Sequence, residues 1–505
     1  MKQSIMSGNP IIPGYTADTT VWYDEQSGLF LAYGTNDGNY VDNVWPPQVF
    51  YSDDFCHWRR QSLELPEAWF PKDHLWVWAP SIAFRQGWYY ITYSIHSTTR
   101  IAMSRSPLGP FYEACGYGEN EPLLEKEQIW GDGDAYDAQL FADEDGRYYL
   151  TFGGFRQCAV CRLAFDEKGK VTVDNGDLRM IETAVGRRKL KFRTVMRQAR
   201  FMEASCMFRR KDRYYLCWST EGCADYKVYY AVSDSPAGPF IQPAGNLLLH
   251  REDDRGILGP GHNSIFLYEG EYYIAYHRQH IPYIDSKRQT CADRLSFDAE
   301  GNILPLRASH EGPGIRVSAG RSDRGADCFR RPSMRDESGR EDLALGRPVC
   351  ASSCRAFIPT EEWDHPYIYA DGYAVDGSYA TRWEPRLDDP NPHLILDLGQ
   401  NTIVTEVVLL FEFISKFYRF RLELLDGGRA DTLKEAAASS GWKVFGAKEN
   451  SMDTPARLLG RMTGRYIRFT FLGAEDLPAA SSVSDPDNAK NGLSLVSLSA
   501  YGERL

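Results

Sequence analysis

A short pattern of alternating polar and hydrophobic positions recurs five times along the first part of the chain. Each copy has a polar turn followed by alternating aromatic and β-branched residues, which predicts a strand entered from a hairpin. The copies are GLFLAYG from Gly28, GWYYITYS from Gly87, GRYYLTFG from Gly146, DRYYLCWS from Asp212 and GEYYIAYH from Gly270. A spacing of about sixty residues is typical of a solenoid or a β-propeller, so the pattern predicts five blades.

A second repeated segment supports the same organisation. The residues from Ser104 to Phe111 read SRSPLGPF, and those from Ser233 to Phe240 read SDSPAGPF. Proline and glycine fix a turn in both copies, and the final Phe is expected to close each copy on the hydrophobic face of its blade.

A short apolar run precedes each copy of the main pattern, and a different residue opens each run. The runs open at Asp18, Ala79, Asp137, Glu203 and His262. The innermost strand of every propeller blade lines the central axis, so equivalent positions in successive blades meet at one mouth. We therefore expect Asp18, Asp137, Glu203 and His262 to lie close together.

Three carboxylates and a histidine in one pocket are electrostatically unfavourable, because like charges raise one another's pKa. The arrangement suits glycoside hydrolysis, in which one carboxylic acid protonates the leaving oxygen while a second carboxylate activates water. The alternative is that each acidic residue forms a turn at the start of its strand. Since the four residues share a repeat phase, we favour a common active site.

Composition indicates a soluble globular chain of two or three domains. The chain has 505 residues, of which 43% are hydrophobic and 25% are charged. Its net charge of −12 argues against a nucleic-acid partner, which requires clustered positive charge. One basic stretch, from Arg187 to Arg200, is expected to form a solvated loop between the third and fourth blades. The 12 Trp and 30 Tyr side chains suit stacking on neutral sugars as well as blade cores.

The cysteines and the N-terminal segment indicate no further chemistry. The 11 cysteines are scattered without a disulfide framework. Cys158 and Cys161 have the spacing of a metal clip but lack a second pair, so we interpret both as packing residues. The segment from Met1 to Pro10 lacks the apolar region of an export signal, and no stretch is long enough to span a membrane. We expect a cytoplasmic location for the chain as given; a secreted protein whose export signal was replaced by Met would look the same.

The motifs around the four residues resemble those of glycoside hydrolase family 43. The matching elements are NPIIPGYTAD from Asn9, the Trp-Ala-Pro of Trp78, the aspartate of Asp137, the glutamate of Glu203, the GPGH ending at His262, and SHEG from Ser309. The last of these resembles the family's blade-closing segment. The resemblance implies an all-β fold that begins with a five-bladed β-propeller.

The resemblance also implies a role for each residue. Asp18 would be the general base, Glu203 the general acid, and Asp137 would keep Glu203 protonated and orient it. Inversion of the anomeric centre would follow, with acid and base about 6.5 to 9.5 Å apart. Arg288 resembles a substrate-binding arginine, although an ordinary surface ion pair is the alternative. No cofactor is required for this catalysis.

Two other residues of the pocket carry roles by resemblance. Trp78 would contact substrate, and His262 resembles an axial histidine that contacts water or, in some members, calcium. A buried histidine with satisfied hydrogen bonds is the alternative for His262. The chain departs from the family at Thr19, where proline is usual, and at Ala204-Ser205, where Gly-Pro is usual. These changes leave the acids in place but weaken any transfer of substrate preference.

A second domain is expected after a polar, Arg-rich and Gly-rich linker at residues 315–341. The propeller would then occupy residues 1–314, and residues 342–505 would form a β-sandwich, because strands such as HLILDLG from His393 alternate in polarity. This part resembles the discoidin-like jelly roll of coagulation-factor type C domains and carbohydrate-binding module family 32. The loop from Asp376 to Thr381 resembles one that holds structural calcium. The family's late glutamate ligand falls at Ser497, and a simple turn at Asp376 is the alternative.

The function expected from these features is removal of α-L-arabinofuranosyl groups from plant cell-wall oligo- or polysaccharides. β-Xylosidase and β-galactofuranosidase activities are the alternatives on the same scaffold, and a phosphorylase would need a cationic pocket for phosphate. A protein of another class, a non-catalytic glycan binder, would not need a paired acid and base. The sandwich would tether substrate near the propeller or only cover one of its surfaces. No membrane partner is expected, and the sequence does not indicate the oligomeric state.

Overall fold

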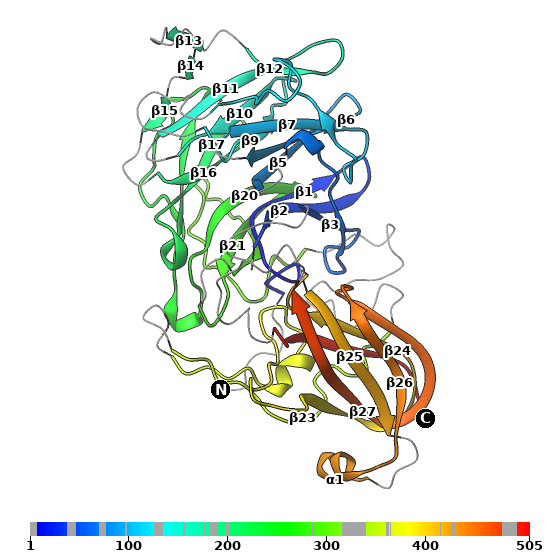
Figure 1. Cartoon of the computed structure of the whole chain (residues 1–505). Coiled ribbons are helices and arrows are strands. Elements are labelled where there is room, and N and C mark those ends of the chain that lie inside the picture. Colours follow the sequence, from blue (N-terminus) through cyan, green and yellow to red (C-terminus); the bar gives the residue numbers. More distant parts are fainter. Residues whose placement is uncertain are drawn as a thin grey trace.

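The computed structural model describes most of both domains. The described residues are 8–37, 47–69, 77–95, 98–125, 135–154, 157–174, 178–181, 189–192, 194–197, 201–283, 287–315, 340–359, 363, 365–414, 416–425, 430–476 and 492–505. The side chains of 178–181, 189–192 and 194–197 are outside this description. Figure 1 shows the propeller, coloured blue to green, above the C-terminal domain, coloured yellow to red.

Five antiparallel sheets in the described part of the chain form the blades of the propeller. Blade one contains β1 (Thr16–Asp24), β2 (Leu29–Asn36), β3 (Gln48–Ser52) and β4 (Arg59–Ser62), and blade two contains β5 (Val77–Arg85), β6 (Trp88–Ile95), β7 (Thr98–Ser104) and β8 (Tyr112–Glu113). Blade three contains β9 (Gln139–Ala142), β10 (Tyr148–Phe152), β11 (Gln157–Phe165) and β12 (Val171–Val173). Blade four contains β16 (Glu203–Arg210), β17 (Arg213–Thr220), β18 (Lys227–Ser233) and β19 (Leu247–Leu249), and blade five contains β20 (Gly261–Tyr268), β21 (Glu271–Gln279) and β22 (Arg288–Arg294).

The repeated pattern forms the second strand of each blade, as predicted. Its fifth position is completely buried in all five copies, at Ala32, Ile91, Leu150, Leu216 and Ile274. Burial of an aliphatic side chain stabilises the fold by roughly 1.5–3 kcal/mol. The repeat is therefore the hydrophobic signature of one strand that packs in the same way five times.

The N-terminal segment closes the ring of blades. The innermost strands contact one another in the order β1, β5, β9, β16 and β20, and β20 contacts β1. The Asn9 backbone N–H donates to the His310 carbonyl at 3.0 Å, and the Asn9 side chain exchanges hydrogen bonds with the backbone of Ala292. The segment that begins at Ser309 thus makes the closing contact that the sequence predicted.

The C-terminal domain is a β-sandwich built from six paired strands. These are β23 (Val349–Ala351), β24 (His393–Phe411), β25 (Lys416–Leu425), β26 (Trp442–Ser451), β27 (Ala456–Asp476) and β28 (Leu495–Arg504), in the order β23-β24-β27-β25-β26 with β28 also on β24. The first half of β24 pairs with β23 and its second half with β28, so this long strand serves two parts of the domain. The core packs around the completely buried Trp383.

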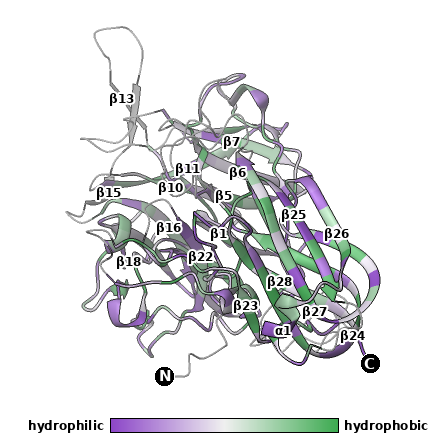
Figure 2. Cartoon of the chain, turned by 60° about the horizontal axis from the view of Figure 1, so that its bottom comes forward, coloured by the Kyte–Doolittle hydropathy of each residue, from purple (hydrophilic) through white to green (hydrophobic). Residues whose placement is uncertain are grey.

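Short helical elements are confined to connections in the described residues. The α-helix α1 (Leu433–Ala438) precedes β26, and the 3-10 helices are η1 (Glu67–Trp69), η3 (Cys223–Asp225), η4 (Asp253–Arg255) and η6 (Asp371–Val375). Figure 2 shows hydrophobic positions along the strands and hydrophilic positions on many connecting loops. No helix in the described part of the chain has the length and hydrophobicity needed to cross a bilayer.

Two expectations about connections need correction. The basic stretch between blades three and four is not simply a loop, because it contains β14 (Lys189–Phe192), paired with β13 (Leu178–Ile181), and β15 (Thr194–Arg197), paired with β11. The predicted linker began at Ile315, but this side chain is buried in the propeller core beside Ile11 and Ile12. The rest of that linker, from 316 to 339, lies outside the described residues.

Cys158 and Cys161 pack in the hydrophobic core, as expected. Both side chains are completely buried in β11, and they belong to two different core clusters. Burial raises the pKa of the Cys158 thiol to about 12, so the reactive thiolate form is disfavoured there.

Candidate active site

The innermost strands begin with a strained residue that turns toward the central axis. Pairing shifts between Ala17 and Thr20 in blade one, and the same shift occurs in blades two, four and five. The residues with positive φ at the blade openings are Asp18 (51°), Ala79 (45°), Asp137 (52°), Ala204 (61°) and His262 (43°). Residues other than glycine rarely adopt such values, and this strain is often retained at functional sites.

Glu203 does not share the repeat phase of the other predicted site residues. The equivalent of Asp18, Asp137 and His262 in blade four is Ala204, and Glu203 comes one residue earlier. Its position matches that of Trp78 in blade two, which also precedes the strained residue. The acidic side chains are therefore supplied from two adjacent positions rather than from one ring of equivalent residues.

The four predicted residues nevertheless meet around one imidazole nitrogen. His262 Nδ1 lies 3.1 Å from Asp18 Oδ1, 3.9 Å from Asp137 Oδ2 and 3.9 Å from Glu203 Oε1. The exposed fraction of the Glu203 side chain is 19%, compared with 9% for Asp18 and 6% for Asp137. Glu203 is thus the most accessible carboxylate of the group.

Asp18 is held as a carboxylate by donors on both oxygens. Thr35 donates to Oδ2 at 2.8 Å, and Arg288 Nη1 donates to Oδ1 at 3.1 Å. Burial alone would raise the pKa of Asp18, but the positive charges of Arg288 and His262 outweigh it and hold this pKa well below its usual range. Asp18 is therefore ionised near neutral pH.

Asp137 behaves in the opposite way. Burial raises its pKa well above the usual range, and the neighbouring Glu203 and Asp18 add to this effect against the opposing charge of His262. Its backbone N–H donates to Ser94 Oγ at 2.8 Å. The site therefore combines an ionised carboxylate at Asp18 with a carboxyl that retains its proton more readily at Asp137, a division typical of acid–base sites.

The two histidines of blade five differ in charge. Burial disfavours protonation of His262, but Asp18 and Asp137 outweigh it and raise its pKa to about 9. Burial dominates at His277 and lowers its pKa to about 4. The Asp18 backbone N–H donates to His277 Nδ1 at 3.3 Å, as expected for a neutral ring. Of the two histidines, His262 is therefore the one that is positively charged at neutral pH, and it faces the three carboxyl groups.

Tyr226 is a site residue that the sequence analysis missed. Its hydroxyl donates to Glu203 Oε1 at 2.5 Å, and its ring packs edge-on against His277 with the centroids 5.0 Å apart. Tyr226 follows the 3-10 helix η3, outside the repeated pattern. Its position in a connection explains why periodicity could not reveal it.

A ring of polar residues at the eighth position of the repeat was also missed. Thr35, Ser94, Ser219 and His277 each accept a hydrogen bond from the strained residue of the next blade, namely from the N–H of Ala79, Asp137, His262 and Asp18. In blade three this position is Gly153, and the Ala204 N–H is instead hydrogen-bonded to Asp137. Four of the quoted copies end at this position, and extending the first copy by one residue to Thr35 would have shown the ring.

Arg288 lies at the site but contacts carboxylates of the protein. Besides Asp18, it binds Asp37, to which its Nε donates at 3.0 Å and its backbone N–H at 2.8 Å. The pair is largely buried, so it differs from the ordinary surface ion pair that was the alternative. Its contact with substrate, like that of the half-buried Trp78, stays a prediction.

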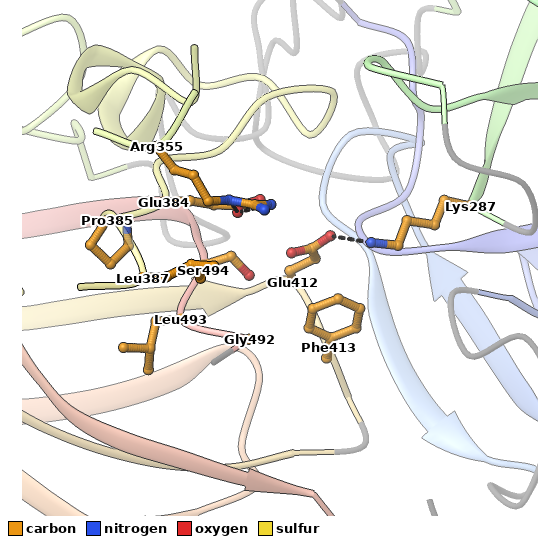
Figure 3. Close-up of a pocket in the computed structure, with 10 residues that line it drawn as sticks. All are labelled: Lys287, Arg355, Glu384, Pro385, Leu387, Glu412, Phe413, Gly492, Leu493 and Ser494. Atoms are coloured by element: carbon orange, nitrogen blue, oxygen red, sulfur yellow. Dashed lines mark hydrogen bonds and ion pairs between the residues drawn. The ribbon is translucent and has the colours of Figure 1, made fainter. Parts of the chain in front are cut away.

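The sandwich contacts the segment that carries Arg288. Lys287 Nζ lies 3.6 Å from Glu412 Oε1 of the sandwich, and both side chains are almost completely buried. Figure 3 shows this pair across a small interdomain pocket, with Phe413 below Glu412. Glu412 also accepts a hydrogen bond from Tyr15 at 2.5 Å and pairs with Arg382 at 3.0 Å. The second domain thus supports the loop next to the site.

The predicted calcium loop has the contacts of a turn. The Ser378 N–H donates to Asp376 Oδ1 at 2.8 Å, and the Thr381 hydroxyl donates to Asp376 Oδ2 at 2.7 Å. Among the described residues, the acidic and histidine ligand atoms close enough to share an ion are those of Asp137, Glu203 and His262, within 4.8 Å of one another. The Asp376 loop therefore offers a weaker set of ligands than the sequence suggested.

Comparison with known proteins identifies the scaffold. Residues 7–303 match the profile of Glycosyl hydrolases family 43. The chain belongs to this family. Residues 373–469 match the profile of the NedA-like, galactose-binding domain. The family 43 propeller and its sandwich together resemble a solved structure described as a glycoside hydrolase, with a TM-score of 0.70, 25% identity and coverage of 98% of this chain and 99% of that one.

Several curated family 43 relatives differ in the sugar that their names specify. A β-D-galactofuranosidase, xynD, of Aspergillus niger is 31% identical over 61% of this chain and 86% of its own length. A β-xylosidase of Xylanibacter ruminicola is 27% identical over 46% of this chain and 74% of its own. An extracellular exo-α-(1→5)-L-arabinofuranosidase of Cellvibrio japonicus is 24% identical over 40% and 62%. This family 43 protein is therefore a glycosidase that hydrolyses O-glycosyl bonds.

Proposed function

We propose that this enzyme removes terminal furanosyl residues from plant-type oligo- or polysaccharides by single-step inversion. The observation that carries the proposal is the group of Asp18, Asp137 and Glu203 around His262. In this group Asp18 is ionised, and Glu203 is the carboxyl most accessible to a glycosidic oxygen. β-D-Galactofuranose and α-L-arabinofuranose are the leading sugars.

In this proposal Asp18 is the general base. It removes a proton from the water that attacks the anomeric carbon, while Thr35 and Arg288 hold its two oxygens in place. His262 compensates the negative charge that the three carboxyl groups bring together. Arg288 and His262 would also stabilise the Asp18 carboxylate before reaction, which makes it a weaker base. We therefore expect substrate binding to draw one of these two cations toward sugar hydroxyls.

Glu203 is the general acid in this proposal. Its accessible carboxyl would protonate the leaving oxygen, and the Tyr226 hydroxyl fixes its direction. Asp137, which retains a proton readily and lies beside Glu203, would help to orient this carboxyl. Proton transfer by a positioned acid or base contributes typically 10²–10⁴-fold to rate.

The choice of furanosides rests on the relatives and on sugar geometry. The relative named as a β-D-galactofuranosidase covers more of this chain than the one named as a β-xylosidase. β-D-Galactofuranose and α-L-arabinofuranose have the same ring configuration and differ in the length of the exocyclic chain. One set of catalytic residues can therefore hydrolyse both furanosides. The space available to the exocyclic chain at C4 would decide which sugar the enzyme prefers.

Three nitrophenyl glycosides test this choice. We expect turnover of the β-D-galactofuranoside and the α-L-arabinofuranoside to exceed that of the β-D-xylopyranoside. Proton NMR of the first-formed sugar would show the inverted anomer. Preferential hydrolysis of the xyloside would reject the furanosidase proposal while leaving the glycosidase assignment intact.

Glu203→Gln tests the acid directly. We expect kcat/KM to fall at least about 100-fold with a poor leaving group and less with 2,4-dinitrophenyl glycosides, which need little protonation. An exposed matched variant, Glu144→Gln, should retain wild-type rates. If the Glu203→Gln variant keeps full activity, another residue is the acid.

A further inference from the structure

A second cleft lies between the two domains. Its volume is about 530 Å³, which falls in the range of roughly 300–1,000 Å³ that ligand pockets occupy. Blade one contributes Trp58 and Arg60 to one wall, and the sandwich contributes Met452 and Asp453 to the other. None of the proposed catalytic acids lines this cleft, so it is separate from the proposed glycosidase site.

Arg60 in this cleft has no partner among the residues that the structure describes. The side chain is half-buried, and burial lowers the pKa of its guanidinium to about 10. No hydrogen bond, ion pair or ring contact joins this guanidinium to another of the described residues. A partly buried cation without a counter-charge destabilises the folded chain. Its presence in a cleft is explained if a ligand supplies the missing charge.

The other charged residues of the cleft already have partners, including Asp453, whose Oδ2 accepts a hydrogen bond from the Ser451 hydroxyl at 3.4 Å. Arg457 donates to Glu406 at 2.8 Å, and the Arg59 guanidinium lies 5.3 Å from the centre of the Tyr51 ring. Glu412, at the edge of the cleft, is bound to Lys287, Tyr15 and Arg382. Arg60 is therefore the charge in the cleft that a ligand is best placed to meet.

The neighbours of Arg60 favour a sugar as that ligand. Phe50 stands opposite Arg60 in the pairing of β3 and β4, so both side chains are on one face of blade one. Trp58 and Tyr51 line the same cleft. Flat aromatic rings stack on sugar rings, and a planar guanidinium binds a carboxylate through two parallel hydrogen bonds. We propose that this interdomain cleft binds an acidic sugar of a glycan chain, with its carboxylate paired to Arg60.

Calorimetric titration of the full chain with trigalacturonate and with its methyl ester tests the proposal. In the methyl ester each carboxyl group is uncharged and carries an added methyl group. We expect the free acid to bind at least tenfold more tightly than the ester, and more weakly as salt is raised. Equal binding of the two probes, or binding of a sulfated oligosaccharide but not of trigalacturonate, would overturn the proposal.

Variants of Arg60 locate the binding. Arg60→Met should weaken trigalacturonate binding about 10- to 100-fold, and Arg60→Lys should fall in between because it keeps the charge but loses the planar fork. The matched control Arg386→Met, which removes an exposed arginine paired with Asp388, should bind as the wild type does. Unchanged affinity of Arg60→Met would overturn the assignment.

A stability measurement separates ligand binding from a structural role. Because Arg60→Met removes a partly buried charge that pairs with none of the described residues, we expect its thermal midpoint without ligand to be equal to or above that of the wild type. A midpoint several degrees lower would show a structural role and would overturn the proposal. Trigalacturonate binding is measured without hydrolysis. A negative result in this assay would therefore overturn the proposed acidic-sugar site and leave the proposed glycosidase activity unaffected.

Discussion

Thr35 couples Asp18 to the backbone of the next blade. The Thr35 hydroxyl donates to Asp18 Oδ2 at 2.8 Å and accepts from the Ala79 N–H at 2.9 Å. One hydroxyl thus orients the proposed base and satisfies the amide of a residue with positive φ.

Replacement of Thr35 by Val, which has the same shape, removes both hydrogen bonds. We expect the free energy of unfolding to fall by about 1–3 kcal/mol, because the buried Ala79 N–H loses its acceptor, and kcat/KM to fall about 10- to 100-fold. Denaturant unfolding and steady-state kinetics measure the two effects. Thr35→Ser keeps the hydroxyl and should stay close to wild type; a Val variant with wild-type kinetics would show that Thr35 does not orient the base.

The charge of His262 makes stability depend on pH. Its pKa is about 9 in the folded chain, above the ordinary value of 6.5. A raised pKa stabilises the fold fully below pH 6.5, and this contribution, on the order of 3 kcal/mol, is lost as the pH rises through 9. Urea unfolding at pH 6 and at about pH 10 measures it. His262→Gln cannot titrate and should lose this part of the dependence; an unchanged profile would contradict the prediction.

Removal of the Tyr226 hydroxyl should affect catalysis more than stability. Tyr226→Phe deletes the hydrogen bond to Glu203, and we expect kcat/KM to fall about tenfold with little change in fold. Tyr276→Phe is the matched control, since Tyr276 donates to Asp293 at 2.7 Å within blade five. Equal losses of activity in the two variants would count against a role for Tyr226 at the acid.

The interdomain ion pair should stabilise both domains together. Lys287→Met leaves Glu412 buried with fewer partners, and loss of one member of a buried pair costs about 3–5 kcal/mol. Arg382 and Tyr15 still contact Glu412, so we expect the lower end of this range in denaturant unfolding. The exposed pair of Arg386 and Asp388 is the control, where Arg386→Met should change stability by less than about 1 kcal/mol.

Chelation tests the calcium prediction for the sandwich. The oxygens of Asp376 are engaged by Ser378 and Thr381 within a turn, so we expect excess EDTA to leave the thermal midpoint of the full chain unchanged. A fall of several degrees that added calcium reverses would establish an ion at this loop.

The sequence was sufficient for the architecture because the blades repeat one hydrophobic pattern. Positions such as Ile91 and Leu150 are buried in the same way, and this is visible without coordinates. The same repetition pointed to Asp18, Asp137 and His262. It did not reveal that Glu203 lies one residue before the strained position of its blade, which is Ala204, because alternation of polar and apolar residues does not show which residue has the positive φ.

Residues outside the strands could not be found in this way. Tyr226 and Asp37 reach the site from connections, where side chains follow no period. Thr35 and Ser94 lie in the repeat, but their partners belong to the following blade. Which blade is the spatial neighbour of another depends on how the ring closes. The sequence of a single strand gives no information about that neighbour.

The closure by Asn9 has a consequence for biosynthesis. Asp18 belongs to the first blade and His262 to the fifth, yet their side chains are 3.1 Å apart. Residues as far as His310 must therefore leave the ribosome before the hydrogen bond from the Asn9 N–H to the His310 carbonyl can form. A polypeptide that stops before blade five lacks His262, so the group of side chains around Asp18 is complete only when the whole propeller has been translated.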